Sequence, residues 1–280
     1  MRDIRIHVLH CGRVCVSPYL PFGCETCNLL KAAGLTTRKK DRLWLPVSSY
    51  FIEHPKGKIL VDTGWSREMS PNGIYDRRAQ IHHMSFPLYF ANQGEIARGA
   101  TVSEQLRLLG VEPENLDYLL LTHLDCDHAS GVKQIRAAKH ILVSADETAC
   151  AKKHRIRYTA SMWEGVPLTE FTFEHTGIGP VGKSYDLFGD GSVQLINIPG
   201  HSDGLFAVQI FNEEGQYVLL YSDGGYASKS WKQLICSGIA MDKEKQAKSL
   251  AWIAKMSVCK DCVESIANHD PDVIPHTIRL

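Results

Sequence analysis

The stretch THLDCDHASG, residues 122–131, constrains this chain more than any other feature, because it places two histidines and two aspartates within six residues. These are His123, Asp125, Asp127 and His128, and the apolar run 118–121 directly precedes them. Imidazole nitrogens and carboxylate oxygens at the end of a buried strand are ligands that suit zinc, iron or manganese. Packing offers no explanation for so dense a polar cluster, so the sequence predicts a metal site here.

Three further residues of the same kinds each follow an apolar run. They are His201 in IPGHSDG, Asp223 in LLYSDGGY and His269 in IANHD. Taken singly, each is more typical of a surface residue or a turn than of a ligand. With the first four they make seven, which is more than one tetrahedral ion requires. If Asp223 bridges, they divide into two shells of four, namely His123, Asp125, His201 and Asp223, and Asp127, His128, His269 and Asp223.

The pattern of apolar residues predicts strands alternating with helices. Strands are expected at 3–9, in a hairpin over 45–64, and at 116–121, 139–144, 184–188, 193–198, 205–211, 216–222 and 262–267. Helices are expected after the capping box at Thr101, from Ser130 onward, over 145–165 and over 242–256. The segment 66–99 is predicted to be irregular and to form a lid or binding loop. Because no linker or charge run marks a boundary, we expect a single domain over 1–280, built from two β-plus-α halves.

Charge and hydropathy exclude several classes of partner. Lys and Arg total 31, as do Asp and Glu, so the formal net charge is zero and gives no electrostatic reason to expect nucleic acid or an anionic membrane as a partner. No segment has the roughly 18 uninterrupted apolar residues of a membrane helix, and the first residues do not resemble a secretory signal. We therefore expect a cytoplasmic protein with no membrane partner.

Nine cysteines leave two interpretations open. The pairs Cys24/Cys27 and Cys259/Cys262 have C-x-x-C spacing and could together supply four thiolates to a structural zinc. Free thiols at chance spacing explain them equally well, because the pairs lie far apart in the sequence.

The order of these motifs resembles the metallo-β-lactamase superfamily over nearly the whole chain. It consists of DTG at 62–64, H-x-D-x-D-H at 123–128, PGH at 199–201, then Asp223 and His269. Tyr226, three residues after Asp223, and the NHD ending at 268–270 make the chain similar to N-acyl-homoserine lactone lactonases. This resemblance implies an α+β fold with an αβ/βα four-layer sandwich, two divalent metal ions between the sheets, with zinc as the usual metal, and hydrolysis of a lactone.

Asp125 departs from the lactonase pattern, which has a histidine at this place. The diiron flavoproteins of the same superfamily carry a carboxylate there, so Asp125 is expected to remain a ligand. A harder oxygen donor shifts the preference toward iron or manganese, and the added negative charge should make a shared water less acidic.

The resemblance also implies roles for individual residues. Two adjacent cations supply a bridging hydroxide that attacks the lactone carbonyl. Tyr226 is expected to donate a hydrogen bond to the oxyanion, unless it is simply a packed aromatic, and Asp127 to pass a proton to the leaving alkoxide. Asp62 is expected to orient a ligand histidine, and Cys126 to be inert rather than a nucleophile.

The substrate is expected to be a small-molecule lactone or ester. Candidate pocket residues are the aromatic stretch 158–163 and His82, His83, Met84, Phe86, Tyr89 and Phe90. The same side chains could instead form a homodimer surface. Alternative functions are hydrolysis of a thioester or a phosphoester, diiron redox chemistry, and non-catalytic metal binding.

Overall fold

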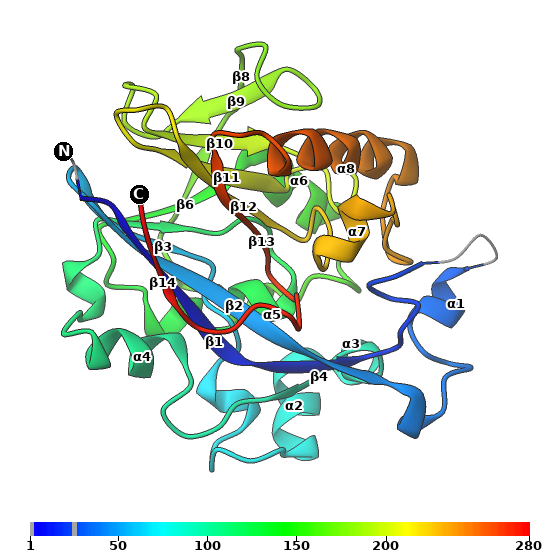
Figure 1. Cartoon of the computed structure of the whole chain (residues 1–280). Helices are drawn as coiled ribbons and strands as arrows, with labels where there is room; N and C mark the ends of the chain where they lie inside the picture. Colours follow the sequence, from blue (N-terminus) through cyan, green and yellow to red (C-terminus); the bar gives the residue numbers. More distant parts are fainter. Residues whose placement is uncertain (1–2, 24–26) are drawn as a thin grey trace.

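Two β sheets face each other in the computed structural model, which describes residues 3–23 and 27–280 (Figure 1). Helices cover the outer surface of each sheet, so the molecule has four layers in the order helix, sheet, sheet, helix. The sandwich predicted from the sequence is confirmed. No helix in the described part of the chain is long and apolar enough to cross a membrane.

The first sheet has eight strands within the described residues. In spatial order they are β14 (Thr277–Arg279), β1 (Arg5–Val16), β2 (Leu43–His54), β3 (Gly57–Val61), β5 (Tyr118–Leu120), β6 (His140–Ser144) and β7 (Leu168–Phe171), and β4 (Gln93–Glu95) pairs with β1. The strands from β14 to β3 are antiparallel, whereas β3, β5, β6 and β7 run parallel. Parallel strands end at the same edge, so the segments that follow β3 and β5 emerge side by side.

The second sheet has six strands in the same described ranges. Its spatial order is β13 (Cys262–Ala267), β12 (Tyr217–Ser222), β11 (Phe206–Phe211), β10 (Val193–Asn197), β9 (Lys183–Asp186) and β8 (Glu174–His175). Strands β12 and β13 are parallel, and the other pairs are antiparallel. The ends of β12 and β13 therefore deliver Asp223 and His269 to the same edge.

The helices are mostly short. They are α1 (Leu29–Ala32), α2 (Arg77–Met84), α3 (Phe86–Ala91), α4 (Val102–Leu108), α5 (Cys126–Ala129), α6 (Ala145–Lys153), α7 (Ser228–Lys232) and α8 (Lys243–Ser257). The Thr101 capping box begins α4 and Asp242 caps α8, as the sequence predicted. Helices α4 and α6 pack on the first sheet, and α8 covers the second.

The central core lies between the sheets. Ile6 and Val61 from the first sheet pack with Val208 and Leu220 from the second, and all four are buried. Burial of apolar surface is the main favourable term in folding, so this core fixes the distance between the two sheet edges that carry the polar residues.

Three predicted elements are wrong in extent or kind. The helix expected over 145–165 ends at Lys153, and the chain turns at 154–157 before a short 3₁₀ helix at Ala160–Met162. No α-helix begins at Ser130. The short α5 ends just before it, at Ala129, and only a 3₁₀ turn at Val132–Gln134 follows. The segment 66–99 is not irregular, because it contains α2, α3 and β4.

Candidate metal centre

Three strand ends are tied together where the ligand loop begins. The Thr122 backbone N–H donates to Asp62 Oδ1 at 2.8 Å, and the Thr122 hydroxyl contacts Ser222 Oγ at 2.8 Å. Both Asp62 and Ser222 have positive φ, 56° and 46°, which side-chain-bearing residues rarely adopt. Strained backbone of this kind persists where the surroundings determine it and is common at functional sites. It lies here directly beside the predicted ligands.

The structure brings all seven predicted ligand residues together at this edge of the sandwich. Their donor atoms form three overlapping groups, each within 4.8 Å, and all seven residues are buried or nearly so. The groups are His123, Asp125 and His201; His123, His128 and Asp223; and Asp127, His128 and His269. They come from both halves of the chain.

One position is formed by Asp127, His128, His269 and Asp223. Asp223 Oδ1 lies 3.3 Å from His128 Nε2 and 3.2 Å from His269 Nε2, and His269 Nε2 lies 3.4 Å from Asp127 Oδ2. Four donors placed about 2.1 Å from one ion in a tetrahedron lie about 3.4 Å from each other. The spacing therefore fits a metal ion.

Unpartnered donor atoms in this position support the same conclusion. His128 Nδ1 contacts Asp62 Oδ2 at 2.8 Å, and His269 Nδ1 contacts the Pro46 carbonyl at 2.7 Å. Nε2 of both rings and Asp223 Oδ1 are buried without a hydrogen-bond partner in the described structure. Anchored imidazoles with a free inward nitrogen are typical of metal ligands, and such orphan atoms are otherwise costly. Asp62 thus contacts a candidate ligand histidine, His128, as its predicted orienting role requires.

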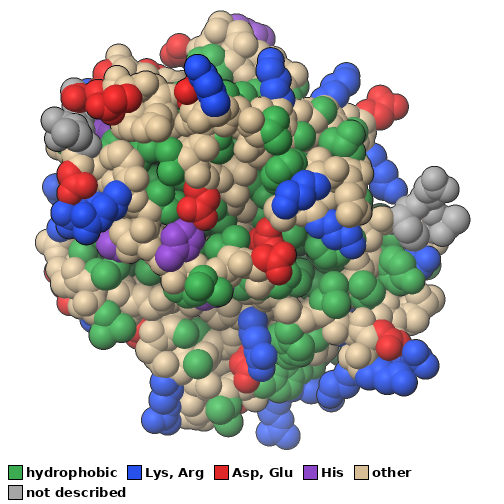
Figure 2. All heavy atoms as spheres, viewed as in Figure 1, with side chains coloured by type: hydrophobic (Ala, Val, Ile, Leu, Met, Phe, Trp, Pro, Cys, Tyr) green, Lys and Arg blue, Asp and Glu red, His purple; other side chains and the backbone are tan. Residues whose placement is uncertain are grey.

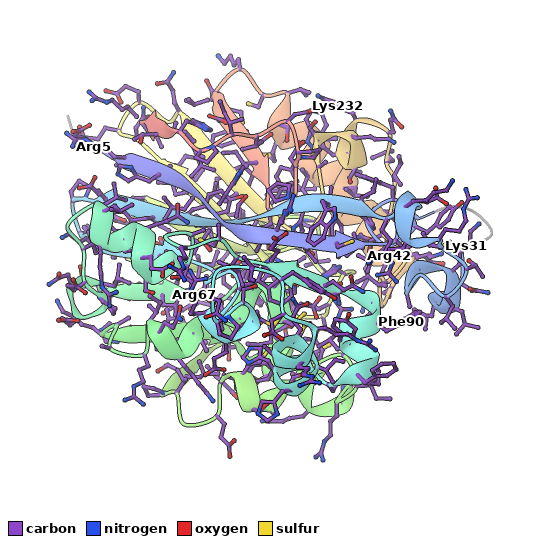
Figure 3. The ribbon with its side chains drawn as sticks, turned by 90° about the horizontal axis from the view of Figure 1, so that it is seen from below. Arg5, Lys31, Arg42, Arg67, Phe90 and Lys232 are labelled. Carbon is purple, nitrogen blue, oxygen red and sulfur yellow. The ribbon has the colours of Figure 1, made fainter. Side chains whose placement is uncertain are left out.

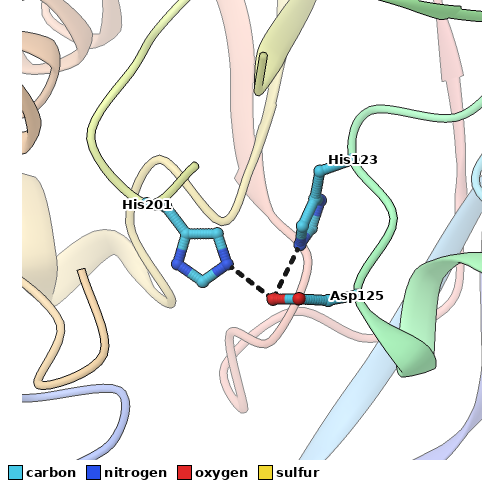
Figure 4. Close-up of side chains that lie close together, drawn as sticks. All are labelled: His123, Asp125 and His201. Carbon is cyan, nitrogen blue, oxygen red and sulfur yellow. Dashed lines mark hydrogen bonds and ion pairs between the residues drawn. The ribbon is translucent and has the colours of Figure 1, made fainter. Parts of the chain in front are cut away.

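The second position is formed by His123, Asp125 and His201, which Figure 4 shows, together with Asp223. Asp125 Oδ2 lies 3.4 Å from His123 Nε2 and 3.0 Å from His201 Nε2. Asp223 Oδ2 lies 4.0 Å and 3.6 Å from the same two nitrogens. These distances also fit one ion, with Asp223 shared between the two positions.

Arg157 is a residue of this site that the sequence did not predict. Its guanidinium forms a two-pronged pair with Asp125, with Nε 2.7 Å from Oδ1 and Nη2 2.6 Å from Oδ2. Burial alone would raise the pKa of Asp125, but the Arg157 guanidinium, together with the neighbouring imidazoles of His123 and His201, holds that pKa well below its usual value. A buried carboxylate such as Asp125 needs a cationic partner, and this need was the only signal for Arg157. The sequence alone did not indicate which lysine or arginine supplies the charge.

Tyr226 lies over the ligand histidines. Its ring stacks on His269, with centroids 5.1 Å apart, and meets the edge of His201 at 5.8 Å. Burial and the carboxylates of Asp223 and Asp125 raise the pKa of Tyr226 well above its usual value. The phenol therefore stays protonated and able to donate a hydrogen bond.

Cys126 is buried between the candidate ligands Asp125 and Asp127. Burial and the adjacent Asp127 and Asp125 raise the pKa of this thiol well above its usual value, which keeps it in the unreactive neutral form.

The cysteine pairs left two interpretations open, a four-thiolate site and free thiols. No group with metal-site geometry among the described residues contains a cysteine. Cys27 Sγ contacts the Tyr19 carbonyl and Cys259 Sγ contacts Asp261, while Cys24 lies outside the described residues. Of the two interpretations, the four-thiolate site finds no support among the described cysteines Cys27, Cys259 and Cys262.

A cavity of about 980 Å³ opens beside the ligands. Asp125, Asp127, Arg157 and Tyr226 line its polar end, and most of the remaining wall is apolar. The apolar wall includes Val14, Val16, Leu20, Leu29, Leu35, Phe86, Leu88, Phe90, Ile156 and Ile239.

The predicted pocket residues are only partly correct. Phe86 and Phe90 of α3 line the cavity, but His82, His83, Met84 and Tyr89 do not. The wall expected from 158–163 is formed instead by 153–157, because Tyr158 and Trp163 pack into the core beside α6. Residues at and after α1 were not predicted as part of the wall.

A side chain from outside the cavity holds its α3 wall in place. Arg42 donates to the Phe90 carbonyl at 2.9 Å and lies over the Phe90 ring (Figure 3). Arg42 precedes β2, so it fixes the end of α3 against the first sheet.

Charges on the face seen in Figure 2 form no single large patch. Acidic and basic side chains are interspersed on the face seen in Figure 2, in keeping with the zero net charge. This face offers no electrostatic site for nucleic acid.

The sequence was compared with models of known protein families. The family model of the metallo-beta-lactamase superfamily matches residues 42–215, more than half of the chain. The chain belongs to the metallo-β-lactamase superfamily. The family predicted from the motifs is therefore confirmed.

Individual relatives are similar to this chain in sequence over most of their length. The chain is 22% identical to the N-acyl homoserine lactonase AttM of Azorhizobium caulinodans, covering 98% of this chain and 96% of that one. It is 28% identical to an N-acyl homoserine lactonase of Bacillus cereus, covering 67% of each. A solved N-acyl homoserine lactone hydrolase, with N-hexanoyl-L-homoserine at its catalytic metal center, has the same fold, with a TM-score of 0.73, 21% identity and 97% and 95% coverage of this chain and that one.

Proposed function

We propose that this superfamily member is a metal-dependent hydrolase that opens the lactone ring of an N-acyl homoserine lactone or a similar ester. One observation carries the proposal: the cluster of histidines and aspartates opens directly into a cavity of about 980 Å³ with mainly apolar walls. A lactone ring at the polar end would leave its acyl chain against these walls. The names of the relatives support the same class of substrate.

The seven clustered residues are proposed as the ligands of two divalent ions that share Asp223. When bound, such ions activate a shared water as hydroxide at neutral pH and polarise the carbonyl oxygen under attack. Zinc is the usual metal of the family, and the oxygen donors of Asp125 favour manganese or iron more than a histidine would.

Two side chains are proposed to act on the substrate. Tyr226 donates its hydroxyl hydrogen to the carbonyl oxygen as negative charge develops there, because the phenol is protonated and lines the cavity. Asp127, which lines the same end, would take the proton of the hydroxyl group added to the carbonyl carbon and pass it to the ring oxygen that leaves. The walls position the acyl chain and exclude water from the rest of the cavity.

A ring-opening assay tests the proposal. Protein loaded separately with Zn²⁺ and Mn²⁺ is given N-hexanoyl- and N-decanoyl-homoserine lactone, and release of the carboxylic acid is followed at constant pH. We expect turnover of both, abolished by Asp223→Ala. Failure to open any lactone with either metal would reject the proposal.

Hydrolysis of a phosphoester or a thioester is a second candidate. Lys153 and Arg155, both exposed, line the cavity and bring positive charge that a neutral lactone does not need. A phosphodiester and a thioester in the same assay would identify this alternative if they were turned over faster than the lactones.

A further inference from the structure

The two metal positions differ in what already contacts their donors. At the position of His123, Asp125 and His201, the Arg157 guanidinium uses both Asp125 oxygens, and its Nη2 also lies 2.7 Å from His201 Nε2. At the position of Asp127, His128 and His269, no lysine or arginine of the described chain makes a hydrogen bond or ion pair with these residues.

The contact with His201 is the decisive one. A guanidinium only donates hydrogen bonds, so Nε2 of His201 must accept with its single lone pair. A metal ion at this position needs that same lone pair. A carboxylate oxygen has a second lone pair and can serve both partners, but this imidazole nitrogen cannot. Metal and Arg157 therefore compete for His201.

Other bonds hold the guanidinium where it can compete. Arg157 Nη1 lies 3.0 Å from the His201 carbonyl and 3.3 Å from the Ile239 carbonyl. With the two bonds to Asp125, the side chain is fixed on three sides and mostly buried, 17% exposed. Arg157 is thus a fixed cation in direct contact with two of the candidate ligands, Asp125 and His201.

We propose that Arg157 is a resident cation that makes the two metal positions unequal. The ion held by Asp127, His128, His269 and Asp223 binds tightly. The ion at His123, Asp125 and His201 binds more weakly, because Arg157 must first release His201. The inference rests on the proposed metal centre, but not on the substrate.

The ion pair between Asp125 and Arg157 also balances charge at this position. Asp125 and Arg157 together carry no net charge, as a single neutral histidine would carry none. The guanidinium thereby offsets the extra negative charge that a carboxylate ligand brings to a shared water, and it keeps a buried carboxylate paired when the weaker ion is absent.

Metal titration tests the inference without any substrate. Protein stripped with a chelator is titrated with Zn²⁺ and with Mn²⁺ by calorimetry, for the unchanged chain, Arg157→Met and Arg155→Ala. The unchanged chain should bind one ion tightly and a second ion with an affinity at least about tenfold lower. Arg157→Met removes the competing donor and should strengthen the second ion about ten- to hundredfold, giving two similar sites.

Arg155→Ala is the matched control, because this arginine is exposed, two residues away, and is expected to leave both affinities unchanged. If Arg157→Met does not fold, Arg157→Lys, which keeps the charge but loses the two-pronged pair, should strengthen the second ion by a smaller factor. Two ions of equal affinity in the unchanged chain, or a second affinity that neither Arg157 variant alters, would overturn the inference. Loss of lactone turnover alone would reject only the proposed function.

Discussion

Each ligand histidine whose inward nitrogen is unpartnered is anchored through its other ring nitrogen. Asp62 anchors His128, the Pro46 carbonyl anchors His269, and Thr122 Oγ1 lies 3.1 Å from His123 Nδ1. An anchored ring presents its free nitrogen without losing side-chain entropy when an ion binds. The anchors therefore contribute to metal affinity although they touch no metal.

Replacing Asp62 by Asn should weaken the tight metal position. Asparagine tolerates the positive φ of 56°, but its neutral amide is a weaker acceptor for His128 Nδ1. We expect metal affinity to fall about ten- to hundredfold, measured by competition with a chromophoric chelator. Asp117→Asn, at a surface carboxylate that pairs with Lys139, is the control and should bind metal normally. Equal affinity in both variants would argue against the anchoring role.

Replacing Tyr226 by Phe separates its two possible roles. If the hydroxyl donates to the developing oxyanion, kcat should fall about a hundredfold while KM changes little. If the ring is only packing on His269, KM changes and kcat does not. Tyr221→Phe, which loses a hydrogen bond from Trp231 away from the cavity, serves as control and should cost about 1 kcal/mol of stability without affecting kcat.

Sequence reasoning reached most of this site because its residues sit at strand ends. His123, Asp223 and His269 each follow an apolar run, so the sequence alone indicates that they lie together at strand ends. Arg157 could not, because it follows no strand and sits in a turn that was predicted as helix. Its role depends on packing between α6 and the His201 loop, which no local pattern records.

At the scale of elements, the His201 loop depends on close approach to α8. Gly200 has φ of 132°, its carbonyl accepts from the Asp242 N–H, and an added Cβ would lie far inside contact distance of the Gln246 backbone. Only glycine allows the loop and the start of the helix to meet here.

Gly200→Ala should therefore push α8 away from the loop. We expect a loss of about 3 kcal/mol in the free energy of unfolding, from both the clash and the backbone strain, measured by urea denaturation. Gly215→Ala is a matched control with φ of 82° and open space around its Cβ, so it should lose only about 1 kcal/mol. A similar loss in both variants would mean that close packing adds nothing at Gly200.

Helices and strands were predicted well where the pattern of apolar residues runs without interruption. They were predicted poorly where a break in that pattern sets the end of a helix. Strands such as β10 and β12 lie within or close to the expected ranges. The segment 66–99 was predicted wrongly although Asp76 caps α2 and Pro87 lies in the first turn of α3, because Ser85, at φ of 78°, separates the two short helices and interrupts their periodicity.

At the scale of the whole molecule, the metal centre joins the two sheets. His123 and His128 follow β5 of the first sheet, whereas Asp223 and His269 follow β12 and β13 of the second. The sequence could predict this joining because the motif order resembles a known superfamily, not because its periodicity specifies how two sheets face each other. Ions bound to ligands from both sheets bind the folded state and not the unfolded chain.

Removing the metal should therefore lower the stability of the entire sandwich. An ion present at a hundred times its dissociation constant stabilises the folded state by about 2.7 kcal/mol, so stripping with a chelator should lower Tm by several degrees, and adding Zn²⁺ or Mn²⁺ should restore it. The measurement is thermal unfolding followed by circular dichroism. Asp223→Ala, which removes the shared ligand, should show a much smaller metal-dependent shift. The same Tm with and without metal in the unchanged chain would mean that the ions do not link the sheets.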